Sequence, residues 1–175
     1  ENKGIDIQVI TRGKLAGKVN YELNVTGGFL KNEIVYLAPG LTYLTTVNPN
    51  LRGIEPIRNQ LGQSISSFYG YQVQGIFQTK EEVAAAPKQD GSAVGRLRYA
   101  DVDGDGAITT ADRTHLGSPV PKFTGGLGLT LTYKNFDLIA YANVSLGNKI
   151  FNQSKWFTDF FPSFLGAAKA ALVKD

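Results

Sequence analysis

The stretch FTGGLGLTLTYKNFDLIAYANVSLG, residues 123–147, decides the expected fold because it alternates twice between apolar and polar or small residues. One face of its first half is apolar: Phe123, Leu127, Leu129, Leu131 and Tyr133. One face of its second half is also apolar: Phe136, Leu138, Ala140, Ala142, Val144 and Leu146. Two alternating runs joined by a short polar turn, here Lys134 and Asn135, are typical of an antiparallel β-hairpin.

A second hairpin is expected at the start of the chain. GIDIQVIT places Ile5, Ile7 and Val9 on one face, and KVNYELNVT alternates in the same way. The apolar positions of that second run are Val19, Tyr21, Leu23 and Val25. The glycine-rich stretch RGKLAG, residues 12–17, is predicted to connect the two strands.

Two interpretations of these strands compete. A soluble antiparallel sheet with one wet face produces the same alternation. The runs also reach the length of about 9–11 residues that a transmembrane β-strand needs. Their polar face carries mostly Thr, Gly, Asn and Ser rather than Lys and Glu, which favours the strands of an outer-membrane β-barrel.

The composition excludes several functional classes. The 175 residues include no cysteine, so disulfides, thiolate metal sites and thiol catalysis are ruled out. The net charge of +3 comes from scattered basic residues, and no basic block interleaved with aromatics indicates nucleic-acid binding. His115 is the only histidine, and no pair or triad of catalytic side chains can be assembled around it. We therefore expect no enzymatic activity.

The middle of the chain, from Gly28 to Pro121, is expected to form one large excursion. If both short turns lie at the same end of a barrel, an even number of spanning strands must separate the two hairpins. Only Phe68 to Phe77 resembles a spanning strand. A single strand does not satisfy the even number, so we expect no spanning strand between the two hairpins. TKEEVAAAP predicts a short helix that Thr79 caps, with Glu82 completing a capping box and Pro87 following its end.

The stretch DVDGDGAITTAD, from Asp101 to Asp112, has the spacing of an EF-hand calcium loop. Such a loop takes ligands from positions one, three, five, seven, nine and twelve, with glycine at position six. In this chain the six ligand positions hold Asp101, Asp103, Asp105, Ala107, Thr109 and Asp112. Ala107 would bind through its carbonyl, and Thr109 through its hydroxyl or a water. The alternative is an Asp-Gly turn solvated by water.

Three further expectations concern the ends of this loop and of the chain. Asp112 is shorter than the bidentate glutamate of sensor proteins, so calcium affinity is expected to be weak. Thr109 or Thr110 is expected to cap an exit helix over TADRTHL, which would make His115 a partly exposed helical residue. The Ala-rich tail predicts another short helix from Ser163.

Several of these motifs occur in a characteristic order. SFYGYQVQGIFQTKEEV is followed by GRLRYADVDGDGAITTADR, then GSPVPKF, YKNFDL and GNKIFN. This order resembles the SusC/RagA family of TonB-linked outer-membrane proteins. The resemblance implies a large β-barrel that imports glycans or peptides across the Gram-negative outer membrane, driven by TonB and working with a SusD-like surface lipoprotein.

The resemblance assigns a part of such a barrel to each region. Residues 1–27 and 122–147 would be barrel hairpins in contact with outer-membrane lipid, and residues 28–121 an extracellular excursion carrying the calcium loop. Residues 148–175 would be an extracellular loop with a short helix. The chain lacks the plug and TonB box of the family and is expected to be a late barrel segment. The alternative function is a soluble calcium-dependent adhesion module with a dockerin-like loop.

Overall fold

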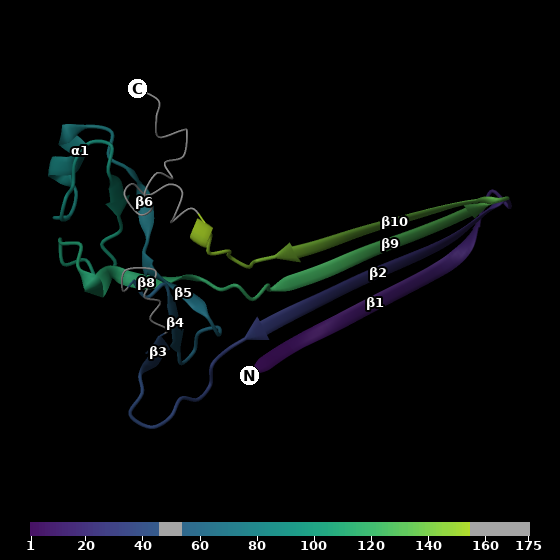
Figure 1. Cartoon of the computed structure of the whole chain (residues 1–175), viewed down its shortest axis with the longest axis horizontal. Coiled ribbons are helices and arrows are strands. Elements are labelled where there is room, and N and C mark those ends of the chain that lie inside the picture. The colour runs from purple at the N-terminus through teal and green to yellow at the C-terminus, as the bar shows by residue number, and fades with distance from the viewer. Residues whose placement is uncertain (46–53, 155–175) are drawn as a thin grey trace.

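The computed structural model describes residues 1–45 and 54–154 of the chain. The described residues form mainly antiparallel β-strands with very little helix, which confirms the predicted fold class at that level. Figure 1 shows two regions, a long sheet that projects to one side and a group of short elements at its other end. Within the described ranges, no helix has the length and apolar character needed to cross a membrane.

The long sheet consists of β1 (Asn2–Leu15), β2 (Val19–Asn32), β9 (Phe123–Tyr133) and β10 (Phe136–Leu146), in that spatial order. Both hairpins predicted from alternation are present, and β2 pairs directly with β9. The turns after β1 and β9 therefore lie together at the far tip of the sheet (Figure 1). Residues 33–122, hereafter the excursion, leave and return at the opposite end.

The pairing register brings most apolar positions of the four strands to one face; Ile10, Leu30, Ile139 and Tyr141 lie on the other. Val25 is opposite both Val9 and Leu127, and Leu127 is opposite Ala142. Directly opposed residues of neighbouring strands point to the same side of a sheet. We call this side the apolar face. The alternate residues form the polar face, where Gln8 donates a hydrogen bond to Asn24 (3.1 Å).

Two limits predicted for the first hairpin were wrong. The expected connection, residues 12–17, is mostly strand, because β1 continues to Leu15 and only Ala16–Lys18 form the turn. The Arg12–Glu22 ion pair (2.7 Å) joins the two strands within that stretch. The expected end of the hairpin at residue 27 is also too early, because β2 continues to Asn32. In this added part of the strand, the ring of Phe29 packs against that of Phe123, with centroids 4.9 Å apart.

The described part of the excursion contains two smaller sheets. The small sheet has the spatial order β3 (Tyr43–Thr45), β4 (Ile57–Gln60), β5 (Ser67–Tyr71) and β8 (Arg113–Gly117). The two-stranded sheet pairs β6 (Val73–Ile76) with β7 (Leu97–Tyr99). The apparent strand Phe68 to Phe77 is thus split at Gln72 between two sheets, and neither half joins the long sheet.

The predicted short helix is present as α1 (Lys80–Ala85). The Thr79 hydroxyl accepts a hydrogen bond from the Glu82 N–H (3.2 Å), which confirms Thr79 as its N-cap. The Glu82 carboxylate accepts a hydrogen bond from the N–H of Gln78 (2.8 Å). A capping box requires the N–H of Thr79 instead, so the predicted box is displaced by one residue. Among the described residues, the side chains buried most completely are those of Phe77 and Asp112. The excursion therefore holds what compact core these ranges contain.

Candidate metal site

The acidic loop lies between β7 and β8 and gathers three of its carboxylates. One oxygen from each of Asp101, Asp103 and Asp105 lies within 4.8 Å of the others. These three residues occupy alternate positions along the chain, as the calcium-loop spacing predicts. Hard carboxylate oxygens of this kind suit Ca²⁺, and among the described residues this is the one such grouping of His, Cys, Asp or Glu.

Backbone N–H groups of the loop fix the carboxylates. Asp101 accepts bonds from the N–H groups of Gly104 (2.7 Å) and Gly106 (2.9 Å). Asp103 accepts from Asp105 (3.2 Å), and Asp105 accepts from Ala107 (2.8 Å). Gly104 and Gly106 adopt φ values of 76° and 84°, a region that glycine enters without steric cost. The two glycines let the chain curl around its own side chains.

Asp112 has a different position from the other three aspartates. Its side chain is fully buried and lies outside the three-carboxylate group. Its two oxygens accept hydrogen bonds from the N–H groups of Val102 and Thr109, both at 2.7 Å. Asp112 therefore ties the start of the loop to its end. The hydrogen bonds from Thr109 and Val102 lower the pKa of the Asp112 carboxyl, in spite of its desolvation.

The remaining predicted ligands also take part in the local backbone structure. Thr109 caps a 3-10 turn, η2 (Thr110–Asp112), and its hydroxyl accepts a hydrogen bond from the Ala111 N–H (3.1 Å). Ala107 forms a parallel bridge with Lys88. Lys88 donates its N–H to the carbonyl of Gly106 (2.9 Å) and accepts a bond from the Ile108 N–H (2.8 Å).

Lys88 was not predicted as part of the site. Its backbone joins the acidic loop to the segment that follows α1. In a paired EF-hand, a second calcium loop would form the corresponding contact. No local pattern in the sequence identifies it, because its contribution comes from its backbone N–H and carbonyl, which any residue other than proline supplies.

The carboxylates raise the local density of negative charge. The hydrogen bond from Asp105 acts to lower the pKa of Asp103. Desolvation and the charges of Asp105, Asp112 and Asp101 outweigh that bond, so the pKa of Asp103 is raised. A cation among these groups would relieve the repulsion.

The predicted exit helix was wrong beyond Asp112. Only Thr110–Asp112 form a helical turn, and Arg113–Gly117 continue as strand β8. β8 pairs with β5, and this tertiary pairing overrides the local preference of the sequence. His115 is consequently a half-buried strand residue that packs edge-on against Tyr69 at 5.3 Å.

No family model matches the chain. It is 33% identical over 152 residues to TonB-dependent receptor P26 of Formosa agariphila, and 34% identical over 157 residues to TonB-dependent receptor P3 of the same organism. The chain is related to the TonB-dependent receptors. Each alignment covers 87% of this chain and 15% of the receptor, so the chain spans a small part of each relative's length.

An alignment that covers 87% of the chain must include residues of both the long sheet and the excursion. The relation to TonB-dependent receptors therefore extends to the segment that carries the acidic loop.

Proposed function

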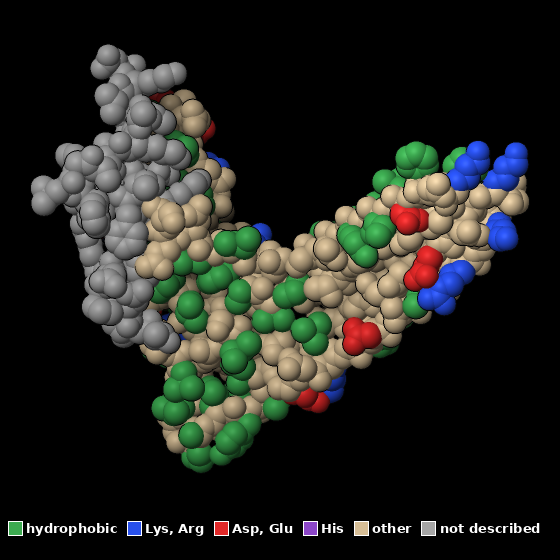
Figure 2. Space-filling view, turned by 45° about the vertical axis from the view of Figure 1, so that its right-hand side comes forward, with side chains coloured by type: hydrophobic (Ala, Val, Ile, Leu, Met, Phe, Trp, Pro, Cys, Tyr) green, Lys and Arg blue, Asp and Glu red, His purple; other side chains and the backbone are tan. Residues whose placement is uncertain are grey.

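We propose that the chain forms part of the barrel wall of a TonB-dependent outer-membrane transporter of the SusC/RagA kind, with the excursion on the extracellular side. The observation that carries this proposal is the apolar face of the long sheet. Contiguous exposed apolar patches larger than roughly a few hundred Å² are rare on soluble monomers. In Figures 1 and 2 the long sheet projects away from the other described elements. Because the chain is related to TonB-dependent receptors, we infer that lipid contacts its apolar face.

The exposure of the apolar face is clearest on the outer strands of the long sheet, β1 and β10. Every residue of β10 is exposed, including Phe136 at 77% and Leu138 at 58%, and Ile5 on β1 is 66% exposed. In water each of these side chains would forgo about 1.5–3 kcal/mol of burial free energy. Contact with hydrocarbon would recover that free energy without a second protein layer.

The length of the apolar face suits a bilayer. The 11 residues of β9 span about 33 Å at the usual rise of about 3.3 Å per residue. Tilted by about 40°, a strand of that length covers about 25 Å along the membrane normal, which is the height of the apolar band of outer-membrane barrels.

Aromatic residues lie at both ends of the apolar face. Phe29 and Phe123 pack together near the excursion. Tyr21, Tyr133 and Phe136 lie near the turns, where Tyr133 and Phe136 are directly opposed. Aromatic girdles at the two membrane–water interfaces are a feature of outer-membrane barrels. The polar face, with its Gln8–Asn24 and Arg12–Glu22 contacts, would line the lumen.

Spin labels can test this assignment, because neighbouring positions of β9 face opposite sides. The chain has no cysteine, so Leu129→Cys and Thr130→Cys each add a single labelling site to it. In the full-length protein reconstituted in lipid, we expect the label at position 129 to be accessible to oxygen but not to a water-soluble nickel complex. The label at position 130 should be accessible to the nickel complex. A label at position 129 shielded from both reagents would indicate a protein-covered face and contradict the proposal.

The partners and cargo follow from the same proposal and concern the whole receptor. TonB would supply energy, a SusD-like surface lipoprotein would cover the extracellular side, and glycans or peptides would be imported. The motif order and the names of the relatives support this transport role, and a transporter of this kind is not an enzyme. The alternative, a soluble calcium-dependent adhesion module, lacks a comparable observation and would leave the apolar face without a partner.

We also propose that the acidic loop binds calcium and that the ion orders the excursion. Asp101, Asp103 and Asp105 would supply carboxylate oxygens and Ala107 its carbonyl, with Thr109 and Asp112 completing the set. The support is the convergence of three carboxylates and the raised pKa of Asp103. Extracellular calcium sites function at about 10⁻⁴–10⁻³ M, so weak affinity would suffice.

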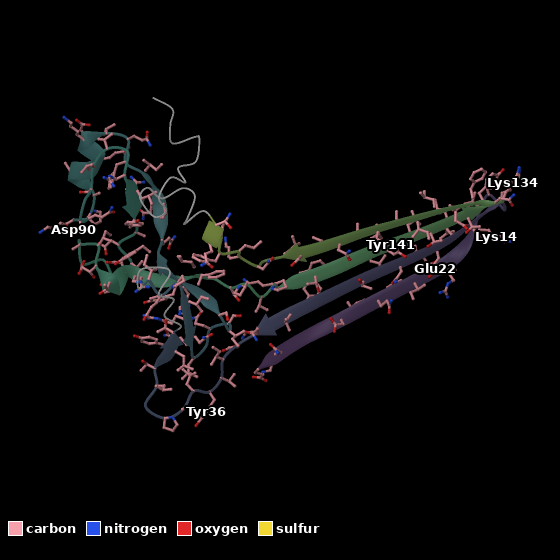
Figure 3. All side chains as sticks on the ribbon, in the orientation of Figure 1. Lys14, Glu22, Tyr36, Asp90, Lys134 and Tyr141 are labelled. Carbon is pink, nitrogen blue, oxygen red and sulfur yellow. The ribbon has the colours of Figure 1, made fainter. Side chains whose placement is uncertain are left out.

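Hydrogen exchange tests the calcium proposal. At millimolar calcium we expect slower exchange in peptides covering residues 101–112 of the full-length protein. Asp103→Asn should abolish most of this protection. Asp90→Asn, which removes an exposed carboxylate elsewhere in the excursion (Figure 3), should keep it. Exchange that does not respond to calcium in the unmodified protein would refute the site.

A further inference from the structure

A group of cationic and aromatic side chains lies on the small sheet, apart from the acidic loop. The guanidinium carbon of Arg58 is 3.5 Å from the ring centroid of Tyr69 and 4.0 Å from that of Tyr43. The guanidinium carbon of Arg113 is 5.0 Å from the ring centroid of Tyr69. We call these four residues the cationic cluster.

The strand order explains how this cluster forms. Tyr69 is on β5, which lies between β4 and β8 in the small sheet. Arg58 comes from β4 and Arg113 from β8, so the two guanidinium groups reach the same ring from neighbouring strands. Arginine over a tyrosine ring is attracted by the negative face of the ring, and this attraction holds both side chains in place.

Neither arginine has an anionic partner in the described part of the chain. The ion pairs there are Lys3–Glu1, Arg12–Glu22 and Lys31–Glu33, all on or next to the long sheet. Arg113 donates one hydrogen bond, to the backbone carbonyl of Glu55 (3.1 Å). The Arg58 guanidinium donates none to any described residue. Within the described residues, most N–H donors of the two guanidinium groups therefore have no partner.

The guanidinium groups of Arg58 and Arg113 carry the same charge and repel each other, so their proximity is unfavourable without a counterion. Both guanidinium groups stay protonated at any physiological pH. Both residues are half-buried, which weakens the screening of their repulsion by water. An anion that contacts both groups would offset this repulsion and use their free N–H donors.

His115 adds a second sign of a missing partner beside the cluster. Its ring lies 5.3 Å from that of Tyr69, and its Nδ1 atom is buried without a hydrogen-bond partner among the described residues. Desolvation and the charge of Arg58 lower the pKa of His115, which favours the neutral imidazole. The Nε2 atom lies 3.4 Å from the amide oxygen of Gln60, so in the neutral ring Nδ1 is a hydrogen-bond acceptor. Buried polar atoms of this kind normally have a partner, and a water beside a bound oxyanion could donate to Nδ1.

We propose that the cationic cluster binds an oxyanion, a carboxylate or sulfate group, of a ligand that reaches the excursion. Planar guanidinium groups bind such groups through paired N–H donors with defined geometry. The tyrosine rings restrict the arginine side chains before binding, which reduces the entropy lost when the ligand is held. This oxyanion site does not depend on the transport function or on calcium.

Equilibrium dialysis of the full-length protein in neutral detergent tests the site with labelled sulfate. We expect saturable binding at millimolar sulfate or below, and competition by acetate if the site accepts carboxylates as well. Arg58→Gln and Arg113→Gln should each weaken binding by about tenfold or more, as loss of a charge-assisted hydrogen bond predicts. Arg58→Lys keeps the charge but loses the planar fork, and it should also weaken binding.

Arg96→Gln is the matched control, because Arg96 is an exposed arginine of the excursion outside the small sheet. It removes the same charge and should leave the affinity unchanged. Absence of saturable sulfate binding to the unmodified protein would overturn the proposal, whatever the folding of the variants. An equal loss in Arg96→Gln would also overturn it, because binding would then reflect overall charge.

Discussion

Asp112 shows how one residue can serve a loop in two ways. The sequence presents it as the closing ligand of a calcium loop, and that role stays a prediction. The structure adds that its buried carboxylate accepts the N–H groups of Val102 and Thr109. Each carboxylate oxygen has two lone pairs, so these bonds leave acceptor capacity for an ion. Asp112 thus organises the loop before any ion binds.

Protonation of Asp112 should loosen the loop. Its pKa is lowered in the folded protein by hydrogen bonds from Thr109 and Val102. The stabilisation is therefore fully present above the unfolded pKa of about 3.9 and is lost as the pH falls through the lower, folded value. Asp112→Asn should remove this pH dependence and, in the absence of calcium, speed exchange of the Val102 and Thr109 amides by about tenfold or more at neutral pH.

Hydrogen exchange between pH 7 and pH 3, corrected for the intrinsic rate at each pH, measures this effect. Asp90→Asn should behave like the unmodified protein, because Asp90 is exposed. If Asp112→Asn exchanged as slowly as the unmodified protein at neutral pH, the two backbone bonds would not be what closes the loop.

The spacing of the aspartates predicted part of this site. Alternate residues in a glycine-containing turn can point to one side, so the meeting of Asp101, Asp103 and Asp105 follows from local geometry. The hydrogen bond between Val102 and Asp112 and the bridge between Lys88 and Ala107 join residues separated by 10 or more positions. Such contacts depend on the path of the chain between them, which no local pattern encodes. The cationic cluster was missed for the same reason.

Among the elements, length decided what the sequence could predict. The strands of the long sheet have 11 or 14 residues, so their alternation repeats often enough to identify both hairpins and the face of each residue. β3 and β4 have 3 and 4 residues, too few for a period to be recognised. β5 and β8 pair across more than forty intervening residues, and that pairing turned an expected helix into a strand.

Glycines account for the misjudged limits of the first hairpin. Gly27 and Gly28 look like a turn, yet both lie within β2 and face partners on β1 and β9. Glycine in a strand can mark close approach of neighbouring groups as well as a bend. Here the Phe123 ring lies over Gly27 and the Asp6 carboxylate lies beside Gly28, so these positions admit neighbours that a side chain would displace.

At the scale of the whole molecule, the direct pairing of β2 with β9 separates two ends. The tip carries the two tight turns, and Figure 3 places Lys14 and Lys134 there. The opposite end carries the excursion with the acidic loop and the cationic cluster. In bacterial outer-membrane barrels, short turns face the periplasm and long loops face outward. The proposed orientation therefore puts both candidate ligand sites on the outside of the cell.

This orientation predicts opposite labelling of the two ends in intact cells. Lys18→Cys places a thiol in the turn after β1, and Asp90→Cys places one in the excursion; both positions are exposed. A membrane-impermeant maleimide should label Asp90→Cys in intact cells and Lys18→Cys only after the outer membrane is permeabilised. Labelling of both in intact cells would exclude a spanning sheet, and the reverse pattern would exclude this orientation. The unsubstituted protein is the control: these 175 residues contain no cysteine, so labelling above its level reports the introduced thiol.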